Sequence, residues 1–177
     1  MTKQVIRSDM RSILPLSPVV RGEKSRRICE RIVRLSAWRS ARTVVLFAPE
    51  DREPDIELLW KYADGRRLVY PRVSGNGLTL YSVESVKDLK VGPLKLREPR
   101  ALAEAKVSPE SVELVLIPGV AFTESGHRCG RGGGYYDRLL AALPPAAVKV
   151  GICFEEQLLE EIPMDPHDMS VDIVIAE

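Results

Sequence analysis

The sequence predicts an α/β fold in which helices cover a mostly parallel β-sheet. Short apolar, β-branched runs alternate with segments that carry helical signals, as they do when helices join parallel strands. The chain has 177 residues, 45% of them hydrophobic and 29% charged. This suits one compact domain rather than a disordered chain or a coiled coil. No repeat, linker or low-complexity tract divides the chain, so we expect a single-domain, three-layer, Rossmann-like sandwich over residues 1–177.

Two basic helices are expected at the N-terminus. The first covers residues 2–14, where Lys3, Arg7 and Arg11 recur every four positions and therefore share one helix face. The second begins at Ser17-Pro18, a capping serine followed by proline at the first helical position. Its apolar stripe consists of Ile28, Ile32 and Leu35.

The strands and later helices follow from apolar runs and the breaks between them. Residues 43–48 (TVVLFA) are an apolar, β-branched run that ends before Pro49, which is typical of a buried strand. Gly75-Asn76-Gly77 is a turn signal between two strands. The predicted strands are residues 43–48, 67–70, 78–83, 113–117, 148–153 and 171–176. We expect helices over residues 55–63 and 134–143 and a turn-rich stretch over residues 86–99.

The composition argues against a secreted or membrane protein. No apolar run approaches the roughly 18 residues that a membrane span needs, and the first residues lack the apolar core of a secretion signal. Cys29, Cys129 and Cys153 lie far apart and form no C-x-x-C pair, so neither a zinc knuckle nor a disulfide framework is indicated. We expect a cytoplasmic protein with no membrane partner.

The near-neutral net charge of +1 conceals a basic N-terminal arm. Residues 1–39 hold ten basic and three acidic side chains, a charge of +7, so the remainder carries −6. Such an arm indicates a polyanionic partner, such as a nucleotide phosphate, RNA or a polyglutamate tail, or else solvated helix faces docked on an acidic body. An RNA-binding arm would interleave aromatic residues with its cations. Since Trp38 is the only aromatic residue here, we do not expect a nucleic-acid partner.

The most informative segment is the glycine-rich loop between the strand at 113–117 and the helix at 134–143. The glycines of its last part, Gly130, Gly132, Gly133 and Gly134, would allow the backbone N–H groups to approach an anion closely, next to a helix N-terminus. Arg131 could grip a phosphate with two hydrogen bonds. Neither G-x-x-x-x-G-K-[ST] nor G-x-G-x-x-G is present, and a flexible surface loop is the alternative interpretation.

The order of the residues is more specific than their number. The loop reads P-G-V-A-F at 118–122, G-H-R at 126–128 and G-R-G-G-G-Y-Y-D-R at 130–138. Together with Lys3-x-x-x-Arg7 and a closing His167-Asp168-Met169-x-x-Asp172, this resembles the 5-formyltetrahydrofolate cyclo-ligase family, also called methenyltetrahydrofolate synthetase. The resemblance extends over nearly the whole chain. Cys129 stands where leucine is expected, an apolar exchange that should leave the chemistry intact.

The resemblance implies a reaction. Family members close 5-formyltetrahydrofolate to 5,10-methenyltetrahydrofolate, converting ATP to ADP and phosphate with Mg²⁺. The formyl oxygen attacks the γ-phosphate to give an N5-iminium phosphate, and N10 then displaces phosphate. In such a reaction the protein mainly positions the substrates and neutralises their charge. The sequence shows no convincing catalytic triad.

The resemblance also implies roles for individual residues. Lys3 and Arg131 are the expected catalytic residues, and Asp137 and Asp168 the expected Mg²⁺ ligands. The expected ATP-binding residues are Lys3, Arg7, Gly130, Arg131, Gly132, Gly133, Gly134, Tyr135, Tyr136 and Asp137. The expected folate-binding residues are Glu53, Gly133, Tyr135 and Tyr136. His167 is expected to order the loop that carries Asp168 rather than to transfer a proton.

Each role has a simpler alternative. Lys3 and Arg7 could form a solvated helix face, Glu53 a loop charge, Asp137 a favourable helix-terminal charge and Asp168 a cap before the last strand. For the whole chain, the alternatives are a family member that binds nucleotide or folate without turnover, an RNA-associated module, and a sugar-phosphate isomerase-like enzyme. We expect a monomer with small-molecule substrates.

Overall fold

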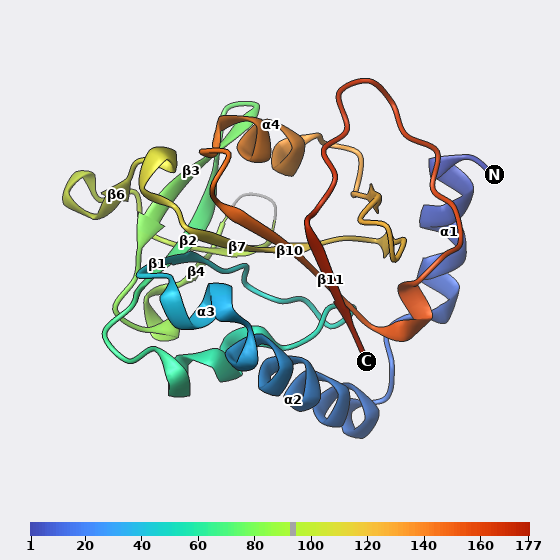
Figure 1. Ribbon diagram of the computed structural model, residues 1–177, viewed down its shortest axis with the longest axis horizontal. Coiled ribbons are helices and arrows are strands. Elements are labelled where there is room, and N and C mark those ends of the chain that lie inside the picture. Colours follow the sequence, from blue (N-terminus) through green and yellow to red (C-terminus); the bar gives the residue numbers. More distant parts are fainter. Residues whose placement is uncertain (93–94) are drawn as a thin grey trace.

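A seven-stranded sheet with strand order β11-β10-β7-β1-β2-β3-β6 forms the centre of the computed structural model, which describes residues 1–92 and 95–177 (Figure 1). The strands β11, β10, β7, β1 and β2 are mutually parallel, and β3 runs antiparallel to β2 and to β6. The mostly parallel sheet confirms the predicted fold class. Its strands are β1 (Thr43–Val45), β2 (Arg67–Ser74), β3 (Gly77–Ser82), β6 (Lys106–Val107), β7 (Leu114–Pro118), β10 (Val148–Cys153) and β11 (Ile173–Ala176).

Helices cover both faces of this sheet and make the sandwich three-layered. The helices α2 (Pro18–Arg34) and α3 (Ser36–Ser40) lie on one face and α4 (Tyr135–Ala142) on the other (Figure 1). Successive strand residues point to opposite faces, so Val44 joins the core beneath α2 while Val45 joins the core beneath α4. Burial of both strand faces explains why these strands read as continuous apolar runs in the sequence.

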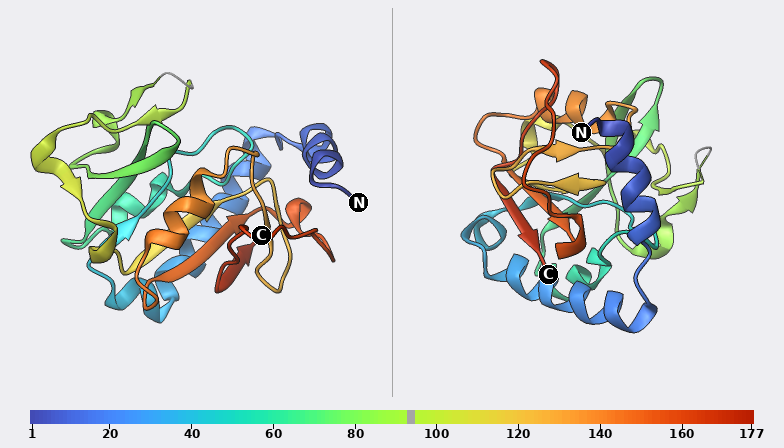
Figure 2. Two further views of the ribbon diagram at one scale, coloured as in Figure 1. Left: turned by 90° about the horizontal axis from the view of Figure 1, so that it is seen from above. Right: turned by 90° about the vertical axis from the view of Figure 1, so that its right-hand side faces the viewer.

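The first helix lies outside these layers. Figure 2 shows α1 (Lys3–Ile13) at one end of the molecule. Its buried residues Ile6 and Met10 pack in a small separate core with Ala121, Cys129 and Ile162. The helix is capped by Thr2, whose side chain accepts a 3.3 Å hydrogen bond from the backbone of Val5. This packing fixes the basic face of α1 next to the glycine-rich loop.

Several local predictions needed correction. The helix predicted over residues 55–63 is a 3-10 helix, η1 (Ile56–Tyr62), and the sheet strand predicted over residues 43–48 ends at Val45. The short hairpin of β8 (Ala121–Phe122) and β9 (Arg128–Cys129) was not predicted. Pro93 and Leu94, in the predicted turn-rich stretch, lie outside the described residues. The remaining elements are η2 (Val86–Asp88), β4 (Lys90–Val91), β5 (Arg97–Glu98), η3 (Ala103–Ala105), η4 (Pro109–Ser111) and η5 (Glu155–Gln157).

None of the helices within the described part of the chain is long and apolar enough to cross a membrane. The cytoplasmic location stays a prediction.

Candidate active site

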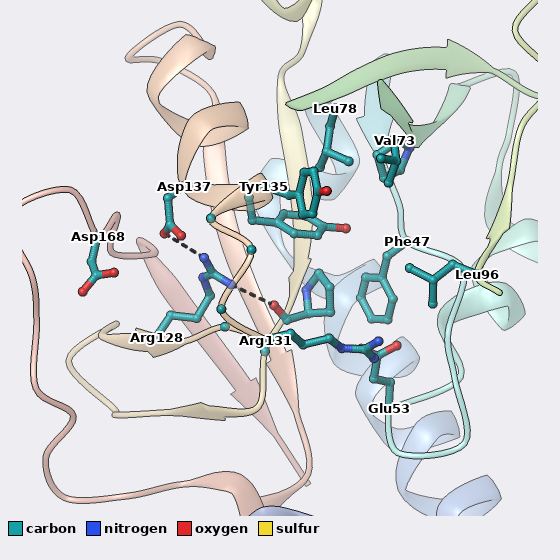
Figure 3. Close-up of a pocket in the computed structure, with 18 of the residues that line it drawn as sticks. Phe47, Glu53, Val73, Leu78, Leu96, Arg128, Arg131, Tyr135, Asp137 and Asp168 are labelled. Atoms are coloured by element: carbon teal, nitrogen blue, oxygen red, sulfur yellow. Dashed lines mark hydrogen bonds and ion pairs between the residues drawn. The ribbon is translucent and has the colours of Figure 1, made fainter. Parts of the chain in front are cut away.

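The residues that the sequence marks as functional lie near the carboxyl ends of β1 and β7, which are neighbours at the centre of the sheet. From β1 the chain continues to β2 on one side and later returns to β7 on the other, so this is the point where the strand order reverses. Ligands of open α/β sheets bind at such a point. A cavity of about 450 Å³ lies here, and its walls include Phe47 and Ala48 beyond β1 and Pro118 and Gly119 at the end of β7 (Figure 3).

Every residue with a predicted role lines this one cavity. The set comes from α1, from the loop after β1, from the glycine-rich loop and α4, and from the segment before β11. The residues are Lys3, Arg7, Glu53, Gly130, Arg131, Gly132, Gly133, Gly134, Tyr135, Tyr136, Asp137 and Asp168. Their individual roles stay predictions, but the fold gathers them from across the whole chain.

The glycine-rich loop is held in a conformation that needs glycine at two positions. Gly132 and Gly134 have φ angles of 104° and 65°, a region that side-chain-bearing residues rarely adopt. Gly134 is the N-cap of α4, so the loop leads directly into a helix N-terminus. Arg7 supports the loop from α1, because its Nε donates a 2.7 Å hydrogen bond to the carbonyl oxygen of Gly130. The basic arm and the glycine loop are thus parts of one structure.

Arg131 turns toward the loop after β1, where two glutamates pair with it. Its Nη2 lies 2.6 Å from Oε1 of Glu53 (Figure 3). Its Nη1 pairs with Glu50. Burial raises the pKa of Glu53 above its ordinary value, although the charge of Arg131 opposes the rise. Burial also opposes the charge on Arg131, but the two carboxylates raise the pKa of its guanidinium.

Lys3 is paired in the same manner at the other side of the cavity. Its ammonium group lies 2.7 Å from Oδ2 of Asp165 and pairs with Asp168. Burial of Lys3 acts against its charge, yet the hydrogen bonds to the two carboxylates raise its pKa. Burial likewise acts against the charge of Asp168, but the hydrogen bond from Lys3 keeps the pKa of this carboxyl below its usual value. Both groups therefore carry full charge at neutral pH.

The carboxylates of the cavity that could hold a metal lie in two places, one at Asp137 and the other around Asp168. The ligand atoms of Asp165, His167 and Asp168 lie within 4.8 Å of one another, whereas Asp137 is not a member of this group. Asp137 instead pairs with Arg128 at 2.8 Å. Carboxylate oxygens are the ligands that Mg²⁺ prefers, so the donors fit such an ion. Asp165 was not predicted, because a lone acid in a Pro-rich loop carries no sequence signal.

The opposite wall of the cavity is apolar. Phe47, Val73, Leu78 and Leu96 face the same space as the ring of Tyr135 (Figure 3). Such a wall suits a flat heterocycle, while Glu53 beneath it offers a carboxylate to N–H donors. Tyr135 and Tyr136 both line the cavity, and Tyr136 also packs against the core beneath α4.

The sequence reasoning missed Arg128 as a cavity residue. Its side chain is only 4% exposed and lies between Asp137 and the carbonyl oxygen of Pro118 (Figure 3). The signal was present, since this arginine is the last residue of the G-H-R element, but a buried ion pair cannot be recognised from one of its partners.

Comparisons with known proteins agree with one another. The model of the 5-formyltetrahydrofolate cyclo-ligase family matches residues 1–177. A probable 5-formyltetrahydrofolate cyclo-ligase of Schizosaccharomyces pombe is 30% identical over 167 residues, which cover 84% of this chain and 81% of that protein. The 5-formyltetrahydrofolate cyclo-ligase of Escherichia coli K12 is 29% identical, with 90% of this chain and 91% of that protein covered. The solved structure of 5,10-methenyltetrahydrofolate synthetase from Aquifex aeolicus superposes with a TM-score of 0.87 at 32% identity, covering 99% of this chain and 90% of that one.

Proposed function

The chain belongs to the 5-formyltetrahydrofolate cyclo-ligase family and is thus a ligase, and from this premise we propose that it uses ATP and Mg²⁺ to close 5-formyltetrahydrofolate to 5,10-methenyltetrahydrofolate. The observation that carries the proposal is the single cavity. Lys3, Arg7 and the glycine-rich loop form a cationic end, while Phe47 and its apolar neighbours form the other end. Two substrates, one polyanionic and one a partly apolar heterocycle, would meet between these ends.

The cationic end would receive the triphosphate. Backbone N–H groups of the loop from Gly130 to Gly134 would face phosphate oxygens at the N-terminus of α4, where the helix dipole favours negative charge. Lys3 supplies an ammonium group and Arg131 a planar guanidinium. Arg7 already hydrogen-bonds to the carbonyl oxygen of Gly130. It would therefore both fix the loop and supply positive charge to the phosphates.

The apolar end would receive the pterin ring. Tyr135 and Phe47 offer faces against which a flat ring can pack, and the Glu53 carboxylate would accept hydrogen bonds from ring N–H groups. Because Glu53 also pairs with Arg131, the ring and the phosphates would share a wall of the cavity. Bound in this way, the formyl group would lie near the terminal phosphate, as direct transfer requires.

The reaction would then run in two steps. The formyl oxygen forms a bond to the γ-phosphorus while the bond from that phosphorus to the bridging oxygen of ADP breaks. N10 next attacks the activated carbon and loses its proton, and the carbon–oxygen bond breaks to release phosphate. An amide oxygen is a poor leaving group until it is phosphorylated. The contribution of Lys3, Arg131 and the loop is therefore to align the groups and neutralise the transferred charge.

A magnesium ion would be held on the acidic side of the cavity. Asp137 and Asp168 are the proposed ligands, and Asp165 and His167 lie beside Asp168. When bound, the ion would lower the negative charge on the β- and γ-phosphates. The carboxylate donors present fit this role, since Mg²⁺ binds through one or two carboxylates plus phosphate oxygens and waters.

The proposal is tested by turnover. The purified protein is incubated with 5-formyltetrahydrofolate, ATP and Mg²⁺, and the near-ultraviolet absorbance of the methenyl product is followed. Product should form only when all three are present, and one phosphate should be released per product. If both substrates bind but no product forms, the protein is instead a binding member of the family without turnover.

The RNA-associated alternative loses support from the position of the arm. Lys3 and Arg7 line the cavity rather than an outer surface, and both are already engaged with residues of the cavity wall. A polyanion reaching them must fit inside the cavity.

A further inference from the structure

Arg128 is a buried cation that joins three parts of the cavity wall. Its Nη2 donates a 2.8 Å hydrogen bond to Oδ1 of Asp137, and its Nη1 lies 3.5 Å from the carbonyl oxygen of Pro118. Its guanidinium lies 5.8 Å from the ring centroid of Tyr136, within the range of a cation–π contact. One side chain at the start of β9 thus contacts the end of β7 and the first turn of α4.

The bonds to Asp137 fix one of its oxygens and leave the other open. Oδ1 accepts hydrogen bonds from Arg128 and, at 3.3 Å, from the backbone N–H of Met169. Within residues 1–92 and 95–177, Oδ2 of Asp137 accepts no hydrogen bond. Both hydrogen bonds therefore go to the same carboxylate oxygen, and Oδ2 remains available to the cavity that Asp137 lines.

The surroundings of Arg128 leave room for this side chain and for little else. A Cβ atom at Gly130 would lie 2.8 Å from Nη1 of Arg128, and one at Gly119 would lie 3.2 Å from its Cγ. The Nε atom is buried and has no hydrogen-bond partner among the described residues. Leaving one donor unsatisfied costs stability, and a buried ion pair adds little stability of its own. Packing alone therefore gives a poor account of an arginine at this position.

We propose that Arg128 is a positioning residue, which holds the Asp137 carboxylate so that its free oxygen can ligate a divalent cation bound with the nucleotide. This inference rests on the proposed function, which assigns Asp137 to the metal. Arg128 acts through Asp137 and through the ring of Tyr136, since its two Nη atoms already hydrogen-bond to Asp137 and Pro118. Outer partners that orient a metal ligand commonly affect metal affinity about 10- to 100-fold.

The test measures metal binding directly, without turnover. Mn²⁺ replaces Mg²⁺, and its affinity in the presence of a non-hydrolysable ATP analogue is measured by electron paramagnetic resonance. The variants are Arg128→Met, Arg128→Lys, Asp137→Asn and the double variant Arg128→Met/Asp137→Asn. The matched control is Arg66→Met, because Arg66 is also largely buried, at 13% exposure, and its guanidinium lies 5.1 Å from the Trp38 ring centroid, outside the cavity lining.

The expected pattern is specific. Arg128→Met and Asp137→Asn should each weaken Mn²⁺ binding about tenfold or more, and the double variant should lose no more than the weaker-binding single variant, because both changes remove the same ligand. Arg128→Lys should recover part of the affinity, since it keeps the charge but not the planar fork. Arg66→Met should bind Mn²⁺ as the wild type does.

Three results would overturn the proposal. One is wild-type Mn²⁺ affinity in a folded Arg128→Met variant, or in Arg128→Lys where the methionine variant fails to fold. Another is a double variant whose loss equals the product of the two single losses. The third is an equal loss in Arg66→Met. Wild-type turnover is measured in parallel: an inactive wild type that still binds Mn²⁺ with nucleotide contradicts the proposed function alone, and a wild type without such binding contradicts both.

Discussion

Lys3 and Asp168, which are 165 positions apart in the sequence, form an ion pair in the wall of the cavity. Arg131 forms a comparable pair with Glu53 across 78 positions. Each catalytic cation that we propose is therefore paired with a carboxylate of the cavity wall. Anionic phosphates would compete with these carboxylates, so nucleotide binding is expected to rearrange both pairs rather than to fill an open cationic site.

The first prediction concerns Lys3. Lys3→Met should weaken ATP binding about 10- to 100-fold, because a hydrogen bond to a charged group contributes about 1.5–3 kcal/mol. Isothermal titration calorimetry gives the affinity, and a thermal unfolding curve shows whether the variant is folded. The matched control is Lys24→Met, since Lys24 on α2 is a similarly buried lysine whose ammonium group lies 3.3 Å from Glu156 on η5. Equal affinities for ATP in the two folded variants would exclude a phosphate role for Lys3.

The second prediction concerns Arg131. Arg131→Ala should lower kcat about 100-fold or more, the scale seen when one preorganised donor is removed from a developing charge. Arg131→Lys should restore only part of the rate, because an ammonium group cannot reproduce a two-pronged guanidinium contact. The control is Arg26→Ala, whose side chain is exposed and pairs with Glu30 on the surface of α2. Full turnover by the alanine variant would contradict the proposed phosphate-binding loop.

The third prediction is a pH dependence of stability at Glu53. Burial raises the pKa of Glu53 in the folded protein above its ordinary value of 4.5. The folded state therefore binds this proton more tightly than the unfolded state does, and the group's favourable contribution is lost as the pH rises through the raised pKa. Glu53→Gln has no such loss. The free energy of unfolding of the variant, relative to wild type, should be higher at neutral pH than below pH 4.5, as urea titrations would show.

A constant difference between the two proteins across this pH range would mean that Arg131 fully compensates for the burial of the Glu53 charge. Measuring the effect of Glu53→Gln in an Arg131→Ala background distinguishes these cases, because without the guanidinium this effect should depend more steeply on pH.

The sequence predicted the residues that line the cavity better than it predicted their partners. The helical spacing of Lys3 and Arg7 and the glycine-rich loop depend on local geometry, which a sequence displays directly. The ion pairs of Arg131 with Glu50 and of Lys3 with Asp165 depend instead on how distant loops pack. The residues next to either acid in the sequence do not indicate its partner.

Two features of the fold escaped prediction for similar reasons. The hairpin of β8 and β9 has strands of two residues each, too short to show an alternating pattern. Over the seven residues of η1, apolar residues at Ile56, Leu59 and Trp60 fit an α-helix as well as a 3-10 helix. Hydrogen bonding decides between the two, and in the structure the Trp60 indole N–H donates to the Tyr70 hydroxyl at 2.9 Å, which ties this segment to β2.

The last prediction asks which carboxylates hold the metal. Two arrangements are open to this structure: the Asp137 and Asp168 pair that the family resemblance implies, and the tighter group of Asp165, His167 and Asp168. The two share Asp168 and differ in their remaining members, so single variants separate them. Asp168 is common to both but also pairs with Lys3, so its removal alters a proposed phosphate-binding cation as well.

We expect Asp137→Asn to raise the half-saturating Mg²⁺ concentration about tenfold or more, because an amide oxygen carries no charge to offset the ion. Asp168→Asn should raise it less, since the lysine it frees can bind phosphate in place of the lost ligand. Asp165→Asn and His167→Asn should leave it near the wild-type value. Activity is measured against Mg²⁺ concentration at saturating ATP for all four variants. A large rise in Asp165→Asn with no change in Asp137→Asn would move the metal to the Asp165 group, and the carboxylate of Asp137 would then be only a partner of Arg128.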